Sequence, residues 1–289
     1  MTTIYYTVEE PECPTIHVEN YKRVQVPANV IKQKYQMISS NDCIVTSKEI
    51  TDFLETVYSP KYINYILSYK PPKTICDLCN CETDSTLTKC TYCNSKINKR
   101  MLMNYMPDDR DTLFTSHSPE EIINTCKILL DIIKKQDDYV YALIRPPGHH
   151  SSFDNHSGFC FVNNAYLLAK NLKGNVLIFD WDLHHGDGTE NLILKNNDQN
   201  IYYVSMHGYG KGFYPGTGTL MTKNIMNIPL RRGTGDREYL YHFDNMFKNF
   251  YNNITVDTII ISNGLDGHRD DNMDFLNLTD NAYVHMTEF

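Results

Sequence analysis

Four short apolar segments constrain the fold more than any other feature of this chain. They cover residues 139–145 (YVYALIR), 175–182 (NVLIFDWD), 200–207 (NIYYVSMH) and 257–266 (DTIIISNGLD). Because apolar residues follow one another without alternation, we expect strands buried on both faces, as in parallel sheets. Amphipathic stretches of helical length lie at residues 119–136, 163–172 and 238–251, and Ser118 is placed to cap the first. This alternation predicts an α/β fold with a single open, mostly parallel sheet and helices on both faces.

The length and charge of the chain narrow its class of function. With 289 residues, 41% of them apolar, it can bury one sizeable core, so we expect a single domain over residues 1–289. No apolar run is long enough for a membrane helix, and the N-terminus lacks the pattern of a signal peptide. We therefore expect an intracellular protein of the nucleus or cytoplasm. A formal net charge of -8 argues against direct nucleic-acid binding but is compatible with a basic substrate.

Each of the four segments ends in polar or ionisable residues. Ligands of open parallel sheets bind outside the carboxyl ends of the strands, so the chemistry is expected there. Alternation along the second segment points Asp180, Asp182 and His184 to one side, and Asp266 ends the fourth segment. A set of two of these carboxylates and the imidazole would leave an open position on a zinc ion, which is typical of catalytic sites.

A pair of adjacent histidines follows the first segment. His149 and His150 come directly after a stiff Pro-Pro-Gly turn, and two imidazoles at a strand end suit proton transfer. Carboxylate partners would fix their tautomers and raise their basicity, and Asp180 and Asp187 are candidates for that role. Taken alone, such a pair also fits two surface residues of a loop.

Five motifs in chain order resemble the histone deacetylase superfamily. They are RPPGHH (145–150), SGFCFVNN (157–164), DWDLHHGDG (180–188), SMHGYGKGFYPGTG (205–218) and SNGLD (262–266). The motif sequences RPPGHH and GFCF resemble those of the class II branch of this superfamily. A weaker similarity lies upstream at His17, Glu19 and Arg23. The resemblance implies the arginase/deacetylase architecture. It also implies removal of acetyl or other acyl groups from lysine side chains of proteins such as histones, and hence a role in chromatin regulation.

The resemblance assigns a role to each residue of these motifs. His150, with Asp187 behind it, is implied as the general base, and His149, paired with Asp180, as a mainly electrostatic partner. The residues implied to hold the catalytic Zn²⁺ are Asp182, His184 and Asp266.

The resemblance also implies a narrow substrate tunnel and a second cation. Phe159 and Tyr214 would form the tunnel walls, Gly158 would leave room for the acyl end, and Met273 would line the rim. The family usually has phenylalanine at the position of Tyr214, so the added hydroxyl makes the tunnel more polar. A monovalent cation, K⁺, would bind near Asp180, Asp182, His184, Ser205 and Met206.

Several alternatives stay open at this point. Arginase-like relatives of this architecture bind two manganese ions, but Gly264 and His268 stand where a second ion would want another carboxylate, which favours one metal. The substrate could be an acetylated polyamine instead of a protein. The chain could also be a catalytically weak protein that binds acyl-lysine or partner proteins without turnover.

The last residues differ from the usual deacetylase pattern. Deacetylases continue into a glycine-rich turn with a tyrosine whose hydroxyl stabilises the oxyanion, whereas this chain ends at Phe289. Its only tyrosine after Asp266 is Tyr283, in a segment with a helical pattern. Loss of one oxyanion donor costs about 10²- to 10³-fold in rate. The chain is accordingly a fragment, a weakened enzyme, or an enzyme with another donor.

Four of the nine cysteines form two CxxC motifs with the spacing of a structural zinc site: Cys76, Cys79, Cys90 and Cys93. The ordinary deacetylase pattern has no such element, so we interpret residues 73–99 as a zinc-knuckle insertion near the loops of the tunnel mouth. It is too short for a core of its own and would depend on the metal for its fold, with Cys81 as a spare thiol. It could stiffen the rim, recruit a protein partner or touch the substrate. Nearby, Asp111 is a candidate rim carboxylate for the substrate backbone, although such acids are more often merely solvated.

Overall fold

The structure is a computed structural model. It describes residues 2–8, 19–70, 73–76, 78–79, 81–84, 89–90, 92–96, 105–106, 109–115 and 117–289. His17 and parts of the predicted insertion 73–99 therefore lie outside the described residues. Backbone contacts divide the chain into two compact units, Met1–Leu167 and Leu168–Phe289.

The first unit contains a three-stranded parallel sheet in the order β2-β1-β7. Its strands are β1 (Thr3–Tyr6), β2 (Ile38–Ser39) and β7 (Val140–Leu143). Its helices are α1 (Lys22–Ile31), a short 3-10 turn (Ser40–Asp42), α2 (Ser47–Glu55), α3 (Pro60–Ser68) and α4 (Ser118–Lys135), and α5 (Asn164–Asn171) contains the boundary between the units. Helices α2, α3 and α4 pack against one another.

Helix α4 shows how the sequence pattern becomes structure. Its apolar stripe is buried at Ile122, Cys126 and Leu129, as the helical spacing predicts. The expected capping role of Ser118 is wrong. Ser118 is the first helical residue, and its hydroxyl accepts a hydrogen bond from the Thr115 amide at 3.0 Å. The hydroxyl thus closes the turn that leads into the helix.

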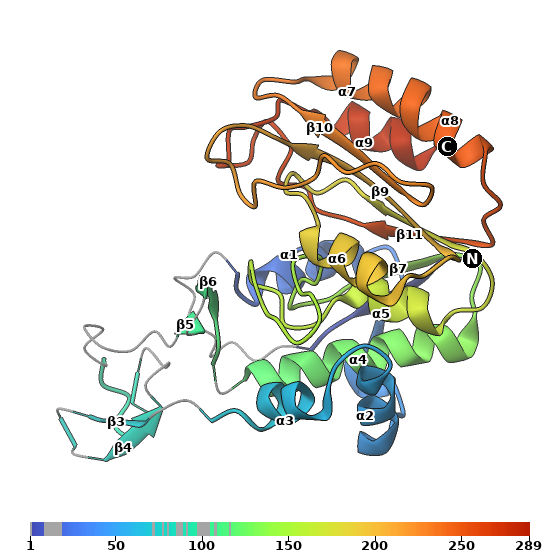
Figure 1. The fold of residues 1–289 in the computed structure, drawn as a ribbon. Coiled ribbons are helices and arrows are strands. Elements are labelled where there is room, and N and C mark those ends of the chain that lie inside the picture. Colours follow the sequence, from blue (N-terminus) through green and yellow to red (C-terminus); the bar gives the residue numbers. More distant parts are fainter. Residues whose placement is uncertain are drawn as a thin grey trace. The chain divides into compact units, whose positions relative to one another are not determined.

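The second unit contains a four-stranded parallel sheet in the order β10-β9-β8-β11 (Figure 1). Its strands are β8 (Val176–Asp180), β9 (Ile201–Gly208), β10 (Ile225–Leu230) and β11 (Thr258–Ser262). Its helices are α6 (Asp187–Asn196), α7 (Asp236–His242), a π-helical turn (Phe243–Phe247), α8 (Lys248–Asn252) and α9 (Asp280–Thr287).

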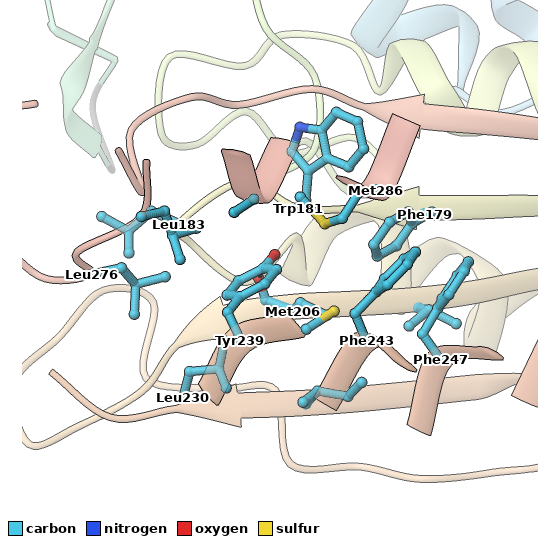
Figure 2. Close-up of a cluster of buried hydrophobic side chains, with 14 of the residues drawn as sticks. Phe179, Trp181, Leu183, Met206, Leu230, Tyr239, Phe243, Phe247, Leu276 and Met286 are labelled. Atoms are coloured by element: carbon cyan, nitrogen blue, oxygen red, sulfur yellow. Dashed lines mark hydrogen bonds between the residues drawn. The ribbon is translucent and has the colours of Figure 1, made fainter. Parts of the chain in front are cut away.

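An aromatic core fixes the helices of the second unit on its sheet (Figure 2). Phe179 on β8 stacks on Phe247 with ring centroids 4.3 Å apart, and Phe247 stacks on Phe243 at 4.8 Å. Burial of each such ring contributes about 1.5–3 kcal/mol. Figure 2 also shows Trp181 and Leu183 from the segment after β8 in the same cluster. The core therefore reaches the carboxyl end of the sheet.

The remaining described strands form two antiparallel pairs before α4. They are β3 (Lys73–Ile75) with β4 (Glu82–Asp84), and β5 (Tyr105–Met106) with β6 (Asp109–Leu113). The first pair belongs to the predicted insertion. None of the helices in the described part of the chain is long and apolar enough to cross a membrane.

The predicted α/β class with parallel strands is confirmed, with two differences of detail. The parallel strands are distributed over two sheets, one in each unit, because β7 pairs with β1, a strand that the sequence patterns did not indicate. Strand β8 is buried throughout, but β7 and β11 are edge strands of their described sheets. Tyr141 is exposed on β7, and Ile259 and Ile261 are exposed on β11. Their apolar runs therefore do not mark burial on both faces.

Candidate functional site

Two neighbouring strands deliver the candidate metal ligands to one edge of the second unit's sheet. Strands β8 and β11 pair in parallel register, with Ser262 opposite Asp180 at their carboxyl ends. The ladder continues one residue further, where the Trp181 amide donates to the Ser262 carbonyl at 3.3 Å. The segments after the two strands, which carry Asp182, His184 and Asp266, consequently start side by side.

Asp182, His184 and Asp266 each place a potential ligand atom within 4.8 Å of the others. His184 Nδ1 lies 2.9 Å from Asp266 Oδ2 and 3.3 Å from Asp182 Oδ1. Two backbone amides hold the carboxylates: the Leu183 amide donates to Asp266 at 3.0 Å, and the His184 amide donates to Asp182 at 2.7 Å. The arrangement thus presents two oriented carboxylates and an imidazole to one point.

The electrostatics of this cluster suit a bound cation. Burial and the charge of Asp182 raise the pKa of Asp266, against the effect of His184. Burial disfavours the charged form of His184, but hydrogen bonds with Asp182 and Asp266 outweigh it and raise the pKa of His184 to about 10. Two half-buried carboxylates this close repel each other, and a proton on His184 relieves that repulsion. A divalent cation would take over this role, with His184 as a neutral ligand. The donor set of two oxygens and one ring nitrogen also fits zinc with an open position.

The surroundings of Asp182 are closely packed. Trp181 and Leu183 are buried in the aromatic core, which turns the side chains between and beyond them away from it. The Trp181 ring donates to the Asn263 side chain at 2.7 Å, so the two segments that carry the candidate ligands are tied together. A Cβ on Gly264 would lie 1.9 Å from Asp182 Oδ2, so only glycine fits beside this carboxylate.

Asp180 takes a different position from the one that alternation predicts. Strand β8 ends at Asp180, and its side chain is buried instead of joining the cluster of three. It accepts hydrogen bonds from the Asp182 amide at 3.1 Å and from the Tyr203 hydroxyl at 3.2 Å. The extended alternation stops with the strand, so it cannot place residues of the following turn. The pairing of Asp180 with His149 stays a prediction, as does the potassium site.

An aromatic loop flanks the candidate metal ligand His184. The ring of Phe213 stacks on the His184 ring at 5.2 Å with an interplanar angle of 6°, and it packs in turn on Phe275 at 3.9 Å. Tyr214, the predicted tunnel wall, meets the His184 ring edge-on at 6.3 Å and is partly exposed. Met273 is also partly exposed. Sequence reasoning missed Phe213, although it lies inside one of the quoted motifs.

Two buried histidines anchor the far end of this loop. His185 Nδ1 lies 2.8 Å from the Thr217 hydroxyl, and His207 Nε2 lies 3.1 Å from the Gly218 carbonyl. Gly218 has a φ of +95°, and a Cβ there would lie 2.3 Å from His207. His207 also contacts the hydroxyl of Ser205 through Nδ1 at 2.9 Å. The loop that carries Tyr214 is accordingly held by the residue next to His184.

The histidine pair lies in the first unit and is tightly enclosed. The rings of His149 and His150 are 4.0 Å apart, and both side chains are buried. Gly158 has a φ of +50°, and a Cβ there would lie 2.4 Å from His150 Cδ2. Phe159 also has a positive φ, and its amide donates to the Thr112 hydroxyl at 3.0 Å. The predicted pairing of His150 with Asp187, the first residue of α6, stays a prediction.

A buried ion-pair network holds the turn before the histidines. Arg145 contacts Glu19 at 2.5 Å and Glu121 on α4 at 2.7 Å, and all three side chains are buried. The Asn164 side chain donates to the Pro146 carbonyl at 2.9 Å. The sequence patterns missed Glu121 because its position is set by the packing of α4, which no local motif reports.

The remaining predicted residues are placed as follows. The four cysteines of the CxxC motifs bring their sulfur atoms within 4.8 Å of one another. Hydrogen bonds from Ser95 and from the amides of Cys79 and Leu78 lower the pKa of Cys76 to about 6.

Asp111 is exposed on β6, and its role at the rim stays a prediction. Tyr283 lies on α9, as its pattern predicts, with a buried hydroxyl that has no hydrogen-bond partner among the described residues.

The fold and these motifs are those of an α/β deacetylase, and comparison with known proteins identifies the family. The profile of the histone deacetylase domain matches residues 17–289. The chain therefore belongs to the histone deacetylase family. The crystal structure of the HDA15 HD domain superposes on 98% of this chain and 80% of its own with a TM-score of 0.75, at 24% sequence identity.

Curated relatives support the same family assignment. Histone deacetylase clr3 of Schizosaccharomyces pombe is 35% identical over 184 residues, which are 57% of this chain and 26% of clr3. Histone deacetylase 15 of Arabidopsis thaliana is 35% identical over 161 residues, 51% of this chain and 29% of the relative. A probable deacetylase of Archaeoglobus fulgidus is 35% identical over 166 residues, 54% of this chain and 45% of the relative. This chain thus spans less than half the length of each of these three relatives.

Proposed function

We propose that this chain is a zinc-dependent deacetylase that removes acetyl groups from lysine side chains of proteins such as histones. The observation that carries the proposal is the convergence of Asp182, His184 and Asp266 at the carboxyl ends of β8 and β11. The chemistry of these donors supports zinc, and their number leaves a coordination position for substrate and water. A zinc ion held there would polarise the amide carbonyl and lower the pKa of water.

In this proposal the buried pair His149 and His150 carries out the acid-base catalysis. His150 would accept a proton from the attacking water and return a proton to the leaving nitrogen, so that the C–N bond breaks and acetate and a free amine form. His149 would stabilise the developing charge. Support comes from the enclosure of the pair: Gly158 packs against His150, and the turn before it is locked by Arg145. A fixed imidazole is what proton transfer requires.

Phe159 and Tyr214 are proposed as the walls that accept the methylene chain of the lysine, with Gly158 near the acyl end and Met273 at the rim. The rigid anchoring of the Tyr214 loop on Thr217 and Gly218 supports a wall of fixed shape. A potassium ion near Asp180, Asp182, His184, Ser205 and Met206 remains part of the proposal on the resemblance alone. We further propose one deacetylase domain over residues 1–289 that contains the insertion 73–99, acting in the nucleus or cytoplasm.

The proposal is tested by assaying the purified chain on an acetyl-lysine peptide and on an acetylated polyamine side by side. Wild type is compared with Asp182→Asn and with Asp270→Asn, whose carboxylate is exposed and outside the cluster. Changes to groups that merely orient metal ligands cost about 10- to 100-fold in activity. We therefore expect Asp182→Asn to lose at least about 100-fold, while Asp270→Asn stays near wild type.

The two substrates separate the alternatives. Hydrolysis of the peptide that disappears in Asp182→Asn supports the proposal. Hydrolysis of the polyamine alone would show that the substrate is a small acetylated amine and not a protein lysine. Zinc that is bound by wild type and lost in Asp182→Asn, without turnover of either substrate, would instead indicate a binding protein and overturn the enzymatic assignment.

A further inference from the structure

The cysteine-rich insertion consists of two equivalent hairpins. In the first, Ile75 pairs with Glu82 and the Cys76 amide donates to the Cys81 carbonyl at 3.0 Å. In the second, Lys89 pairs with Lys96 and the Cys90 amide donates to the Ser95 carbonyl at 2.8 Å. Both hairpins thus repeat one backbone pattern at the same spacing. Each carries one CxxC motif in its loop, so the two halves present their thiols in the same way.

The sulfur atoms meet across the two hairpins. Cys76 Sγ lies 3.6 Å from Cys93 Sγ, and Cys79 Sγ lies 3.6 Å from Cys90 Sγ. Zinc–sulfur bonds of about 2.3 Å in a tetrahedron place neighbouring sulfurs about 3.8 Å apart. A disulfide would need about 2.05 Å. The observed separations therefore match the edges of a tetrahedral tetrathiolate site, and each close pair joins one hairpin to the other.

No apolar core among the described side chains of this insertion could replace an ion. The buried cluster here consists of Cys76 and Cys90, with Cys79 and Cys93 packed against it. The two described apolar side chains of the loops, Leu78 and Tyr92, are 74% and 70% exposed. Among the described side chains the two halves touch through their sulfurs, so an ion bound there would join them.

Hydrogen-bond donors surround the sulfurs. The Ser95 hydroxyl lies 3.2 Å from Cys76 Sγ and 3.0 Å from Cys93 Sγ, and the Tyr92 amide donates to Cys90 Sγ at 3.4 Å. Such donors stabilise thiolates and orient them toward a metal. Cys81 differs from the four ligands, since its thiol points to the Cys79 carbonyl at 3.6 Å.

We propose that Cys76, Cys79, Cys90 and Cys93 hold one structural zinc ion that joins the two hairpins into a single module. Four thiolates complete the coordination of the ion and leave no position for substrate. The site is distinct from the cluster of Asp182, His184 and Asp266, and its failure would leave the proposed deacetylase function standing.

The test measures zinc per chain in Cys76→Ser and in Cys81→Ser, the matched control in the same insertion, both in an Asp182→Asn background that removes the other proposed ion. We expect one zinc in Asp182→Asn and in Asp182→Asn with Cys81→Ser, and none with Cys76→Ser. Replacement by Co²⁺ should give thiolate-to-cobalt charge-transfer absorption that Cys76→Ser abolishes. Equal zinc and equal absorption in the two cysteine variants would overturn the proposal, and so would iron in place of zinc.

A second measurement needs no variant and is independent of folding defects. The wild-type chain is titrated with zinc under reducing conditions, and the reactivity of its thiols toward a thiol reagent is followed. Zinc should protect four thiols together and leave Cys81 reactive. Protection of fewer than four, or of none, would refute a tetrathiolate site.

Discussion

Replacement of Gly264 by alanine tests the metal centre through a single added carbon. The new Cβ would lie 1.9 Å from Asp182 Oδ2, where contacts below 3.0 Å essentially never occur, so the carboxylate has to move by about 1.1 Å. Gly264 does not have a positive φ, so the backbone itself tolerates alanine. The perturbation therefore falls on the position of one proposed ligand.

The displacement is large compared with what a metal site accepts. Ligand distances in metal sites stay within about 0.2 Å of their ideal values. Movement of Asp182 also weakens the hydrogen bond from the His184 amide, now 2.7 Å long. Since changes to groups that only orient ligands cost 10- to 100-fold in affinity, we expect at least about 100-fold weaker zinc binding. This corresponds to about 2.7 kcal/mol.

The assay is a zinc competition titration against a chelator of known affinity, run in a Cys76→Ser background that removes the other proposed zinc, with circular dichroism to verify the fold. Gly210→Ala is the matched control, because its Cβ would meet only Phe275 at an ordinary 3.7 Å. Deacetylation of an acetyl-lysine peptide should fall in parallel with zinc binding. A folded Gly264→Ala protein with wild-type zinc affinity would refute the assignment of Asp182 as a ligand.

Three further predictions concern the histidine pair, the core and the surface. Gly158→Ala would place a Cβ 2.4 Å from His150 at a φ of +50°. It should lower kcat/KM about 100-fold at unchanged zinc content, and full activity would exclude His150 as the base. Phe247→Ala should cost about 3–5 kcal/mol in urea unfolding, and a loss below about 1 kcal/mol would contradict the stacked core. Hydrogen bonds from Lys134 and Thr46 lower the pKa of Glu49 from 4.5 to about 2. The Glu49 carboxylate therefore stabilises the fold above pH 4.5 and loses this effect as the pH falls through about 2. Glu49→Gln should accordingly lower the urea midpoint at pH 7 but not near pH 2, and an equal difference at both pH values would refute this.

The sequence predicted the strands that end at the candidate site residues more reliably than the other strands of the two sheets. Apolar runs predicted β7, β8, β9 and β11 within one or a few residues of their observed ends. The sequence pattern does not predict strand β10, because Asn227 and Pro229 interrupt its apolar run. An edge strand tolerates such residues. Strand β1 was missed because four residues at the start of a chain make a weak pattern. The predicted helix at residues 238–251 exists, but as α7, a π-helical turn and α8 in succession.

The sequence by itself determined the α/β class and the set of candidate ligands, because both follow from local periodicity and from residue types at strand ends. Only the tertiary structure decided that Asp180 turns inward, that Phe213 stacks on His184, and that Glu121 reaches Arg145. It also decided the equivalence of the two cysteine hairpins. These features depend on side-chain directions in turns and on contacts between residues far apart in the chain. Such contacts are fixed by tertiary packing, and they leave no periodic pattern in the sequence from which they could be predicted.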